Sequence, residues 1–219
     1  MGGAGPTQPR HDDIHIWQFD LDAPISAVVR ARDALSSDEV ASARRFARET
    51  DRRRYEIGRA ALRHLLGEYT GVAANELRFR YGDRGKPSLE GGAFAADVRF
   101  NVAHSDGVFM CAVTSGRDVG IDVERVHDGL DLDAMMALAF TADEQNDVRR
   151  SVAPPVEFTR IWVRKEAVAK ATGEGMGAGL FSLDSSDRSW SIIELIAPVG
   201  YMAAVAVGGD AEVSYLTRD

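Results

Sequence analysis

Two carboxylates stand two positions apart in residues 119–124, a segment in which every second residue is apolar. Because side chains of a β-strand alternate between its faces, Asp122 and Glu124 are predicted to share one face. Carboxylates ~7 Å apart repel each other by about 2 kcal/mol at an effective dielectric of ~20, so a compensating cation is expected. The functional interpretation is a divalent cation such as Mg²⁺, which takes one or two carboxylates and leaves its other positions to water and phosphate oxygens. The alternative is a solvated strand face, where water and salt screen the repulsion.

A third acid lies in a predicted helix over residues 156–171. Glu166 and Lys170 are four residues apart there and therefore share a helix face. An ordinary exposed ion pair, worth ~0.2–0.5 kcal/mol, would explain the spacing equally well. Trp162, one turn before Glu166, together with nearby alanines, favours a partly buried face instead. An acid and a lysine on such a face suit metal ligation and neutralisation of a phosphate.

Basic side chains that could bind phosphate occur in three further places. Eight arginines stand in residues 44–63 against three carboxylates, a local balance of +5 in a chain of net charge −8. Phosphate binding and a solvated helix of ion pairs explain this balance equally well. Lys86, in a Gly-Lys-Pro turn, could add a phosphate contact. His104 follows a predicted strand in a polar turn, where a lone histidine is more often merely solvated than functional.

Hydrophobic periodicity and turn residues predict the elements that position these groups. Ser36 and Glu39 form a capping box before a helix at 40–48, and Gly71 ends a longer helix at 51–69. Strands are predicted at 14–17, 98–102, 108–113, 119–124, 190–196 and 201–207.

An internal resemblance suggests how these elements are organised. Residues 109–113 and 201–205 are alike at a constant offset of 92, and each segment follows a long helix and a glycine-bearing loop. We therefore predict two related α+β halves that meet near residue 117, with a site between them.

Composition sets the broad class. A chain of 219 residues, 45% hydrophobic and 27% charged, fits one large or two small globular domains. The net charge of −8 opposes broad binding to nucleic acid or anionic membranes. The single cysteine, Cys111, excludes an intrachain disulfide. The sequence shows neither the ~18 apolar residues of a membrane span nor a secretory signal, so we expect a cytoplasmic protein with a disordered start at residues 1–13.

Four motifs then occur in order, with the stretch 140–144 between the last two: Gly85-Lys86-Pro87, Phe100-Asn101-Val102-Ala103-His104-Ser105, Val119-Gly120-Ile121-Asp122-Val123-Glu124 and Trp162-Val163-Arg164-Lys165-Glu166-Ala167-Val168-Ala169-Lys170. Together they resemble the 4′-phosphopantetheinyl transferases of the surfactin-synthetase-activating type. The resemblance implies an α+β fold, a pseudo-twofold duplication in which each half is a small, mainly antiparallel sheet packed with a long helix. Residues 14–117 would supply the phosphate-binding half, and residues 118–219 the half with the metal-binding acids and the catalytic lysine.

The resemblance also implies roles for individual residues. The metal ligands would be Asp122, Glu124 and Glu166, and the catalytic residues Glu166, Lys170 and His104. Coenzyme A would be held by Arg48, Arg59, Lys86, Pro87, Ala103, His104, Ser105 and Lys170. Lys170 would neutralise charge on the leaving phosphate, and His104 would hold a coenzyme A phosphate. Many members have a serine where this chain has Ala103, so a hydroxyl contact to the ligand is missing here.

The activity implied is that of a Mg²⁺-dependent holo-acyl-carrier-protein synthase, a monomer that modifies a serine of apo acyl or peptidyl carrier proteins and releases adenosine 3′,5′-bisphosphate. Either Glu166 or a metal-bound water would accept the serine proton. Carriers of polyketide and nonribosomal peptide synthetases in secondary metabolism are expected, with fatty-acid carriers as an alternative. Two rival functions are a noncatalytic module that binds coenzyme A or a carrier protein, and another Mg²⁺-dependent phosphotransferase or phosphohydrolase acting on a free nucleotide.

Overall fold

The computed structural model describes residues 9–22, 24, 31–83, 85–91, 97–173 and 190–216. The elements follow one another as β1 (Asp13–Asp20), α2 (Ser37–Ala43), α3 (Glu49–Thr70), β2 (Phe79–Tyr81), β3 (Pro87–Leu89), β4 (Val98–Ser105), β5 (Val108–Ser115), β6 (Val119–Arg125), α4 (Leu132–Ala139), α5 (Ala142–Arg150), α6 (Pro154–Thr172), β7 (Trp190–Glu194), β8 (Tyr201–Gly208) and β9 (Glu212–Leu216). None of the described helices combines the length and apolarity needed to cross a membrane.

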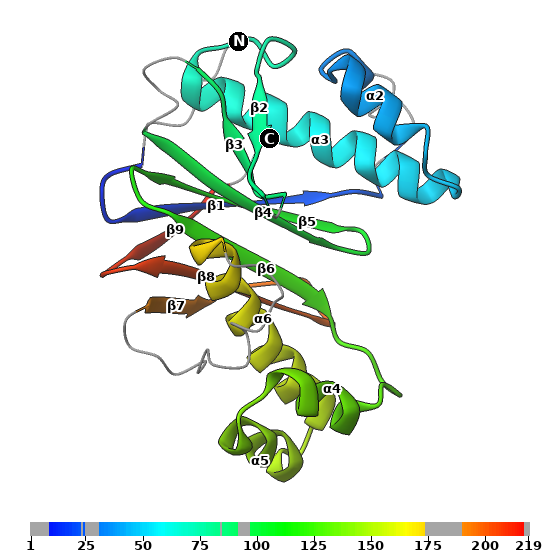
Figure 1. Ribbon diagram of the computed structural model, residues 1–219, viewed down its shortest axis with the longest axis vertical. Coiled ribbons are helices and arrows are strands. Elements are labelled where there is room, and N and C mark those ends of the chain that lie inside the picture. The colour runs from blue at the N-terminus through cyan, green and yellow to red at the C-terminus, as the bar shows by residue number, and fades with distance from the viewer. Residues whose placement is uncertain are drawn as a thin grey trace.

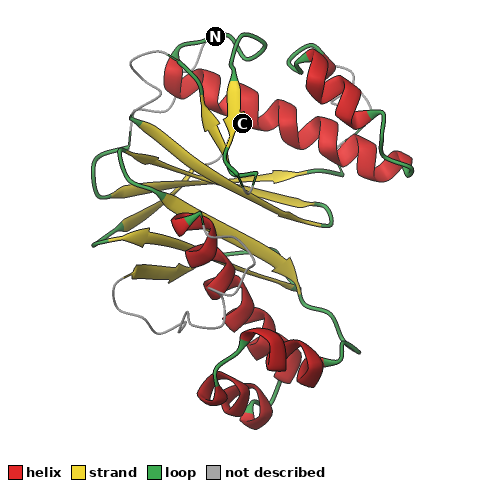
Figure 2. Ribbon diagram, viewed as in Figure 1, coloured by secondary structure: helices red, strands yellow, loops and turns green. Residues whose placement is uncertain are grey.

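The described chain forms four layers in the order helix, sheet, sheet, helix (Figure 1). The first sheet has the strand order β4-β5-β1-β9 and is covered by α3, and the second has the order β6-β8-β7 and is covered by α6. The two strands that look alike in sequence, β5 and β8, are inner strands of their sheets. The α+β fold, with a sheet and a long helix in each half, is therefore confirmed (Figure 2).

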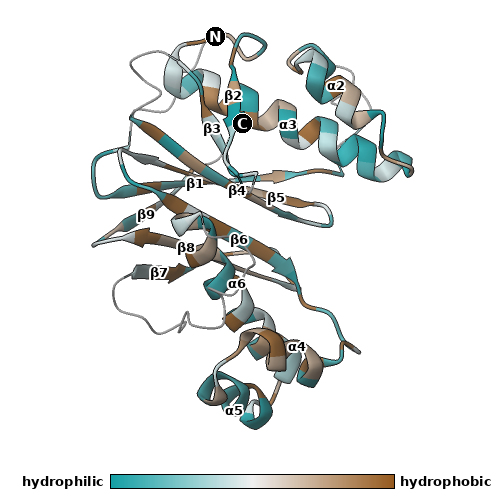
Figure 3. Ribbon diagram, in the orientation of Figure 1, coloured by the Kyte–Doolittle hydropathy of each residue, from teal (hydrophilic) through white to brown (hydrophobic). Residues whose placement is uncertain are grey.

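A shared core joins the two sheets. Ile16 and Met110 of the first sheet pack with Ile121 and Val205 of the second, and all four side chains are at most 1% exposed. Hydrophobic residues accordingly gather on these strands, whereas much of α3 and α5 is hydrophilic (Figure 3). The strands are buried on both sides because a helix covers the opposite face of each sheet.

The C-terminal strand crosses between the halves. β9 pairs in parallel with β1, with Asp13 opposite Glu212 and Trp17 opposite Leu216. The predicted boundary between the halves near residue 117 would place β9 with the second half, whereas β9 joins the first sheet. The sequence of a short strand does not indicate which sheet edge the strand will join. β1 itself begins at Asp13, and the Arg10 guanidinium donates to the Asp13 carboxylate at 3.0 Å. The remainder of the predicted disordered start, residues 1–8, lies outside the described residues.

Helix termini follow local capping chemistry. The Ser36–Glu39 capping box begins α2, and Gly71 ends α3 in the left-handed conformation, both as predicted. α2 was predicted to run to residue 48 but ends at Ala43, because the arginines that follow are exposed and bury no face that would hold a further turn. Two further helices, α4 and α5, were not predicted; they pack against the first half of α6 through Met136, Phe140 and Phe158.

Candidate active site

Strand β6 presents its two carboxylates toward α6. Val119, Ile121 and Val123 point into the core between the sheets. The alternation of side chains therefore directs Asp122 and Glu124 to the opposite face. Asp122 is only 4% exposed, and Glu124 is half-buried. The predicted shared strand face is thus present, and it is a protein-covered face rather than an open one.

Gly120 allows the backbone of α6 to pack directly against the backbone of β6. A Cβ atom at Gly120 would lie 2.0 Å from the carbonyl oxygen of Ala167 and 2.4 Å from the backbone nitrogen of Ala171. Only glycine fits such a contact between a strand and a helix. The approach brings Lys170 within reach of β6, where its ammonium donates to Asp122 Oδ1 at 2.6 Å.

The three acids influence one another electrostatically. Burial raises the pKa of Glu166 to about 7, and the negative charges of Asp122 and Glu124 add to the rise while Lys170 opposes it. Burial also raises the pKa of Asp122 against the attraction of Lys170. The pKa of Glu124 is raised by burial as well, although the Ser105 hydroxyl bonds to it. One ammonium group thus faces three carboxylates that were predicted to lie close together.

Two carboxylate oxygens at this site have no hydrogen-bond donor among the described residues. Asp122 Oδ2 and Glu166 Oε1 are buried and unpartnered. A buried carboxylate oxygen without a partner is costly, and a hard divalent cation with oxygen ligands would satisfy both atoms. Within the described part of the chain, no three acidic, histidine or cysteine side chains lie close enough together to ligate one metal ion. Asp122 Oδ1 is instead directed toward the Lys170 ammonium.

Side chains of β4 connect the first half to β6. The side-chain amide oxygen of Asn101, Oδ1, accepts a hydrogen bond from the Ile121 backbone N–H at 3.0 Å. The Ser105 hydroxyl donates to Glu124 Oε2 at 2.8 Å and accepts from the Arg125 backbone N–H at 3.1 Å. The two strands therefore lie side by side in Figure 1, joined by side chains. Ser105, predicted to bind coenzyme A, orients Glu124 in this structure.

A cleft of about 350 Å³ brings most of the predicted residues together. It is lined by Gly85, Lys86, Pro87, Asn101, Val102, Ala103, His104, Asp122, Glu124, Ala169, Lys170 and Gly173. His104 is exposed overall, but desolvation of its ring by the cleft lowers its pKa, and the Lys170 ammonium lowers it further. Two acids, two lysines and a histidine therefore line one cavity between the halves, and the charges of both acids raise the pKa of Glu166.

Arg48 and Arg59, predicted to hold coenzyme A, do not line this cleft. Arg59 donates to Glu39 Oε1 at 2.6 Å and to the Tyr81 hydroxyl at 3.0 Å, with its guanidinium over the Phe79 ring. These partners belong to α2 and to the β2–β3 hairpin. Arg48 is exposed at the start of α3 and has no side-chain capping bond there. Helical periodicity alone does not show which face of α3 meets a ligand.

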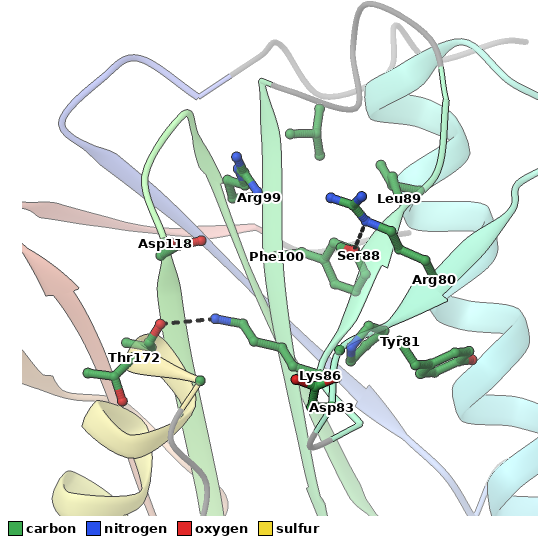
Figure 4. A pocket seen from close by; sticks show the side chains of 15 residues that line it. Arg80, Tyr81, Asp83, Lys86, Ser88, Leu89, Arg99, Phe100, Asp118 and Thr172 are labelled. Carbon is green, nitrogen blue, oxygen red and sulfur yellow. Dashed lines mark hydrogen bonds between the residues drawn. The ribbon is translucent and has the colours of Figure 1, made fainter.

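Lys86 reaches across the seam between the halves. Its ammonium donates to the carbonyl oxygens of Val119 at 3.3 Å and Ala171 at 3.1 Å. Burial of the ammonium lowers the pKa of Lys86, which Asp118 partly offsets. The side chain also borders a second cavity of about 570 Å³, which shares Lys86, Pro87 and Gly173 with the cleft (Figure 4).

Two positioning residues, Asn101 and Gly120, were not predicted from the sequence to have a role at the site. Asn101 is 4% exposed between apolar strand residues, and a buried amide must find a partner. Gly120 interrupts an apolar strand, which indicates a close backbone approach. Both signals were present in the sequence, but the identity of each partner depends on the tertiary fold.

Comparison with known proteins identifies the family of this chain. Residues 118–208 match the model of the 4′-phosphopantetheinyl transferase superfamily, and residues 23–116 match that of the 4′-phosphopantetheinyl transferase N-terminal region. The chain is 37% identical over 213 residues to the 4′-phosphopantetheinyl transferase HetI of Nostoc sp., covering 90% of this chain and 89% of the relative. It is also 28% identical over 208 residues to a 4′-phosphopantetheinyl transferase of Bacillus subtilis, covering 92% and 89%. This chain therefore belongs to the 4′-phosphopantetheinyl transferases, enzymes that transfer phosphopantetheine to carrier proteins.

Proposed function

We propose that this enzyme takes phosphopantetheine from coenzyme A and transfers it, in a Mg²⁺-dependent reaction, to a serine of an acyl or peptidyl carrier protein. The carrier serine oxygen forms a bond to the β-phosphorus of coenzyme A. The bond from that phosphorus to the bridging oxygen breaks, and adenosine 3′,5′-bisphosphate leaves. The observation that carries the proposal is the convergence of Asp122, Glu124 and Lys170 on a cleft whose other wall contains Ala103 and His104.

The acids fit a divalent cation by their chemistry. Asp122, Glu124 and Glu166 would hold it, and the unpartnered Asp122 Oδ2 and Glu166 Oε1 are the oxygens that lack a donor. Bound there, Mg²⁺ would supply positive charge for the diphosphate oxygens on which negative charge develops. Basic side chains of the protein would stabilise the same negative charge, because phosphoryl transfer depends mainly on positioning and on electrostatic stabilisation.

Each remaining residue has a proposed task. Lys170, held by Asp122, would neutralise charge on the departing phosphate. His104, exposed on the cleft wall, would hold a phosphate of coenzyme A. Glu166 would accept the proton of the carrier serine. Among the two arginines selected from the sequence, the exposed Arg48 is the better candidate for the adenosine phosphate end, because Arg59 is already engaged by Glu39.

A mass-spectrometric assay tests this function. The enzyme is incubated with coenzyme A, Mg²⁺ and an apo carrier protein, and both the mass gain of the carrier and the release of bisphosphate are measured. Asp122→Asn and Glu166→Gln should abolish transfer while retaining the fold, whereas Glu157→Gln on the same helix should retain transfer. Wild-type-like turnover in both site variants would remove the metal-site assignment.

The same assay separates the rival functions. A noncatalytic binding module would retain coenzyme A without any mass gain, and a phosphohydrolase would release bisphosphate without modifying the carrier. We propose carriers of polyketide and nonribosomal peptide synthetases as the natural substrates. A panel that includes a fatty-acid carrier, assayed at equal concentrations, tests that choice by comparing kcat/KM.

A further inference from the structure

The turn between β4 and β5 contacts β6 at one of the site acids. Ser105, the last residue of β4, donates its hydroxyl hydrogen to Glu124 Oε2 at 2.8 Å. The same hydroxyl oxygen accepts a hydrogen bond from the Arg125 backbone N–H at 3.1 Å. Asp106, the next residue of the turn, accepts from the Arg125 guanidinium at 3.0 Å. Two successive turn residues therefore hold the last two residues of β6.

The direction of the Ser105 hydrogen bonds follows from the chemistry of its partners. A backbone N–H can only donate, so the hydroxyl oxygen accepts from Arg125. An ionised carboxylate can only accept, so the single hydroxyl hydrogen goes to Glu124. Oε2 is thereby occupied, whereas Oε1 takes part in no hydrogen bond among the described residues. Because Glu124 lines the cleft, Oε1 is the oxygen that remains for a ligand there.

The turn is also held from the side of α3. Arg54 of α3 donates to both Asp22 oxygens, at 2.8 and 2.9 Å, and lies 3.9 Å from Asp106. The Leu21 backbone N–H donates to the Gly107 carbonyl at 2.7 Å. Asp106 itself has a φ of 46°, which is uncommon for a residue other than glycine. Such a backbone persists where the surrounding contacts fix it, and here the contacts come from α3, β6 and the end of β1.

We propose that Ser105 is a positioning residue for the metal site: it occupies Oε2 of Glu124 and leaves Oε1 to bind the cation, while Asp106 holds Ser105 in place. The inference rests on the function proposed above, because it takes Glu124 to be a metal ligand. Mg²⁺ demands a nearly ideal octahedral arrangement of oxygens, which a carboxylate of fixed orientation can meet with one oxygen. Loss of a hydrogen-bond partner of a ligating side chain typically weakens metal binding by about 10- to 100-fold.

The first test measures metal binding without turnover. Mn²⁺ is titrated into the protein in the absence of coenzyme A and carrier, and free Mn²⁺ is read by electron paramagnetic resonance. Ser105→Ala should raise the Kd at least about tenfold, whereas Ser105→Thr, which keeps the hydroxyl, should remain within about threefold of wild type.

Ser151→Ala is the matched control for this titration. Ser151 is also half-buried, and its hydroxyl accepts a backbone N–H, that of Ala153, at 3.1 Å before α6. Its replacement should leave the Kd for Mn²⁺ unchanged. A Ser105→Ala variant with a lower thermal midpoint in EDTA but the Kd of wild type would show a role confined to stability and would overturn the proposal.

Two variants of Asp106 separate its charge from the conformation of the turn. Asparagine and glycine both tolerate a positive φ, but neither has a carboxylate for Arg125. Asp106→Asn and Asp106→Gly should each raise the Kd for Mn²⁺ by about two- to fivefold, a modest effect because the ion pair is exposed. Binding as in wild type by both variants would contradict the part assigned to Asp106.

Wild-type crystals soaked in Mn²⁺ cover the case in which Ser105→Ala does not fold or the Kd is too high to titrate. Anomalous scattering locates the ion, and we expect one Glu124 oxygen on the ion and the other on Ser105. An ion bound by both Glu124 oxygens, or a Glu124 that has left Ser105, would overturn the proposal. Absence of the ion from the acids would refute the proposed metal site together with this inference. An ion bound as expected in an enzyme that transfers no phosphopantetheine would refute the proposed function alone.

Discussion

Lys170 and Asp122 form an ion pair at 2.6 Å between α6 and β6, and only one of the two Asp122 carboxylate oxygens takes part. The other oxygen, Oδ2, is buried and has no hydrogen-bond donor among the described residues. The pair therefore compensates the Asp122 charge incompletely. Such a pair can separate when ligands bind, so that Asp122 contacts a cation and Lys170 contacts an anionic ligand.

The stability of the ion pair can be measured by a double-mutant cycle. Lys170→Met should lower the free energy of unfolding in EDTA at neutral pH by about 1–3 kcal/mol, because it leaves the buried Asp122 carboxylate without its donor. Adding Asp122→Asn should recover most of that loss, since the uncompensated charge is then gone. Urea denaturation gives all four free energies. Strictly additive effects would show that the two groups do not depend on each other.

Lys170 should also matter more for turnover than for binding. Lys170→Ala should reduce kcat by about a hundredfold, as expected for loss of a group that stabilises developing charge, and weaken coenzyme A binding much less. Single-turnover kinetics and calorimetry separate the two quantities. An effect confined to binding would mean that Lys170 only anchors the ligand.

The protonation of Glu166 predicts a pH dependence of stability in EDTA. Its pKa is about 7 in the folded protein against an ordinary value of 4.5, so between these pH values the folded state binds more protons than the unfolded state. The free energy of unfolding should therefore decrease as the pH rises from about 4.5 to 7, by on the order of 3 kcal/mol from this group. Glu166→Gln should remove that part of the decrease and be more stable than wild type at pH 8.

Mg²⁺ binding should oppose this decrease in the free energy of unfolding as the pH rises. A cation binds the ionised carboxylate, so its affinity should rise with pH until Glu166 is ionised, with release of a proton. Calorimetry in two buffers of different ionisation enthalpy counts the proton. Equal Mg²⁺ affinity at pH 5.5 and pH 8 would contradict the assignment of Glu166 to the metal site.

The backbone contact at Gly120 predicts a large effect of one methyl group. Gly120→Ala would place a carbon against the Ala167 carbonyl, which belongs to helix backbone and cannot move alone. We expect a loss of about 3 kcal/mol or more in the free energy of unfolding and a fall in kcat, because α6 must shift. Gly208→Ala is the control, since nothing lies within 4 Å of its added carbon. Similar behaviour of the two variants would show that α6 does not rest on β6 at this point.

The two arginines of the basic region should behave differently. Arg59→Met removes a donor to Glu39, a carboxylate that is 5% exposed, and should lower the free energy of unfolding by about 1–2 kcal/mol with little change in the KM for coenzyme A. Arg48→Met should leave stability unchanged and raise that KM, if Arg48 holds the adenosine phosphate end. Denaturation and steady-state kinetics on both variants check the contrast, and the reverse pattern would restore Arg59 as the ligand.

Much of the fold followed from local patterns. The capping box at Ser36, the glycine that ends α3 and the alternation along β6 each depend on a few neighbouring residues, and each was predicted. The helix α5 was not predicted, although Thr141 and Glu144 form a second capping box at its start. The pairing of β9 with β1 depends on an edge far away in the sequence, and no local pattern encodes it.

The amino-acid sequence by itself determined which chemical groups this protein has and which of them share a face: two acids on one side of a strand, an acid and a lysine on one side of a helix. Only the tertiary structure decided how these faces pack together and which basic side chains contact the acids. Lys86 and Arg59 carry the same charge, but the groups to which they donate, the Ala171 carbonyl and the Glu39 carboxylate, come from segments distant in the sequence. Spacing along a chain sets local geometry, whereas desolvation and partner choice depend on segments that meet only after folding.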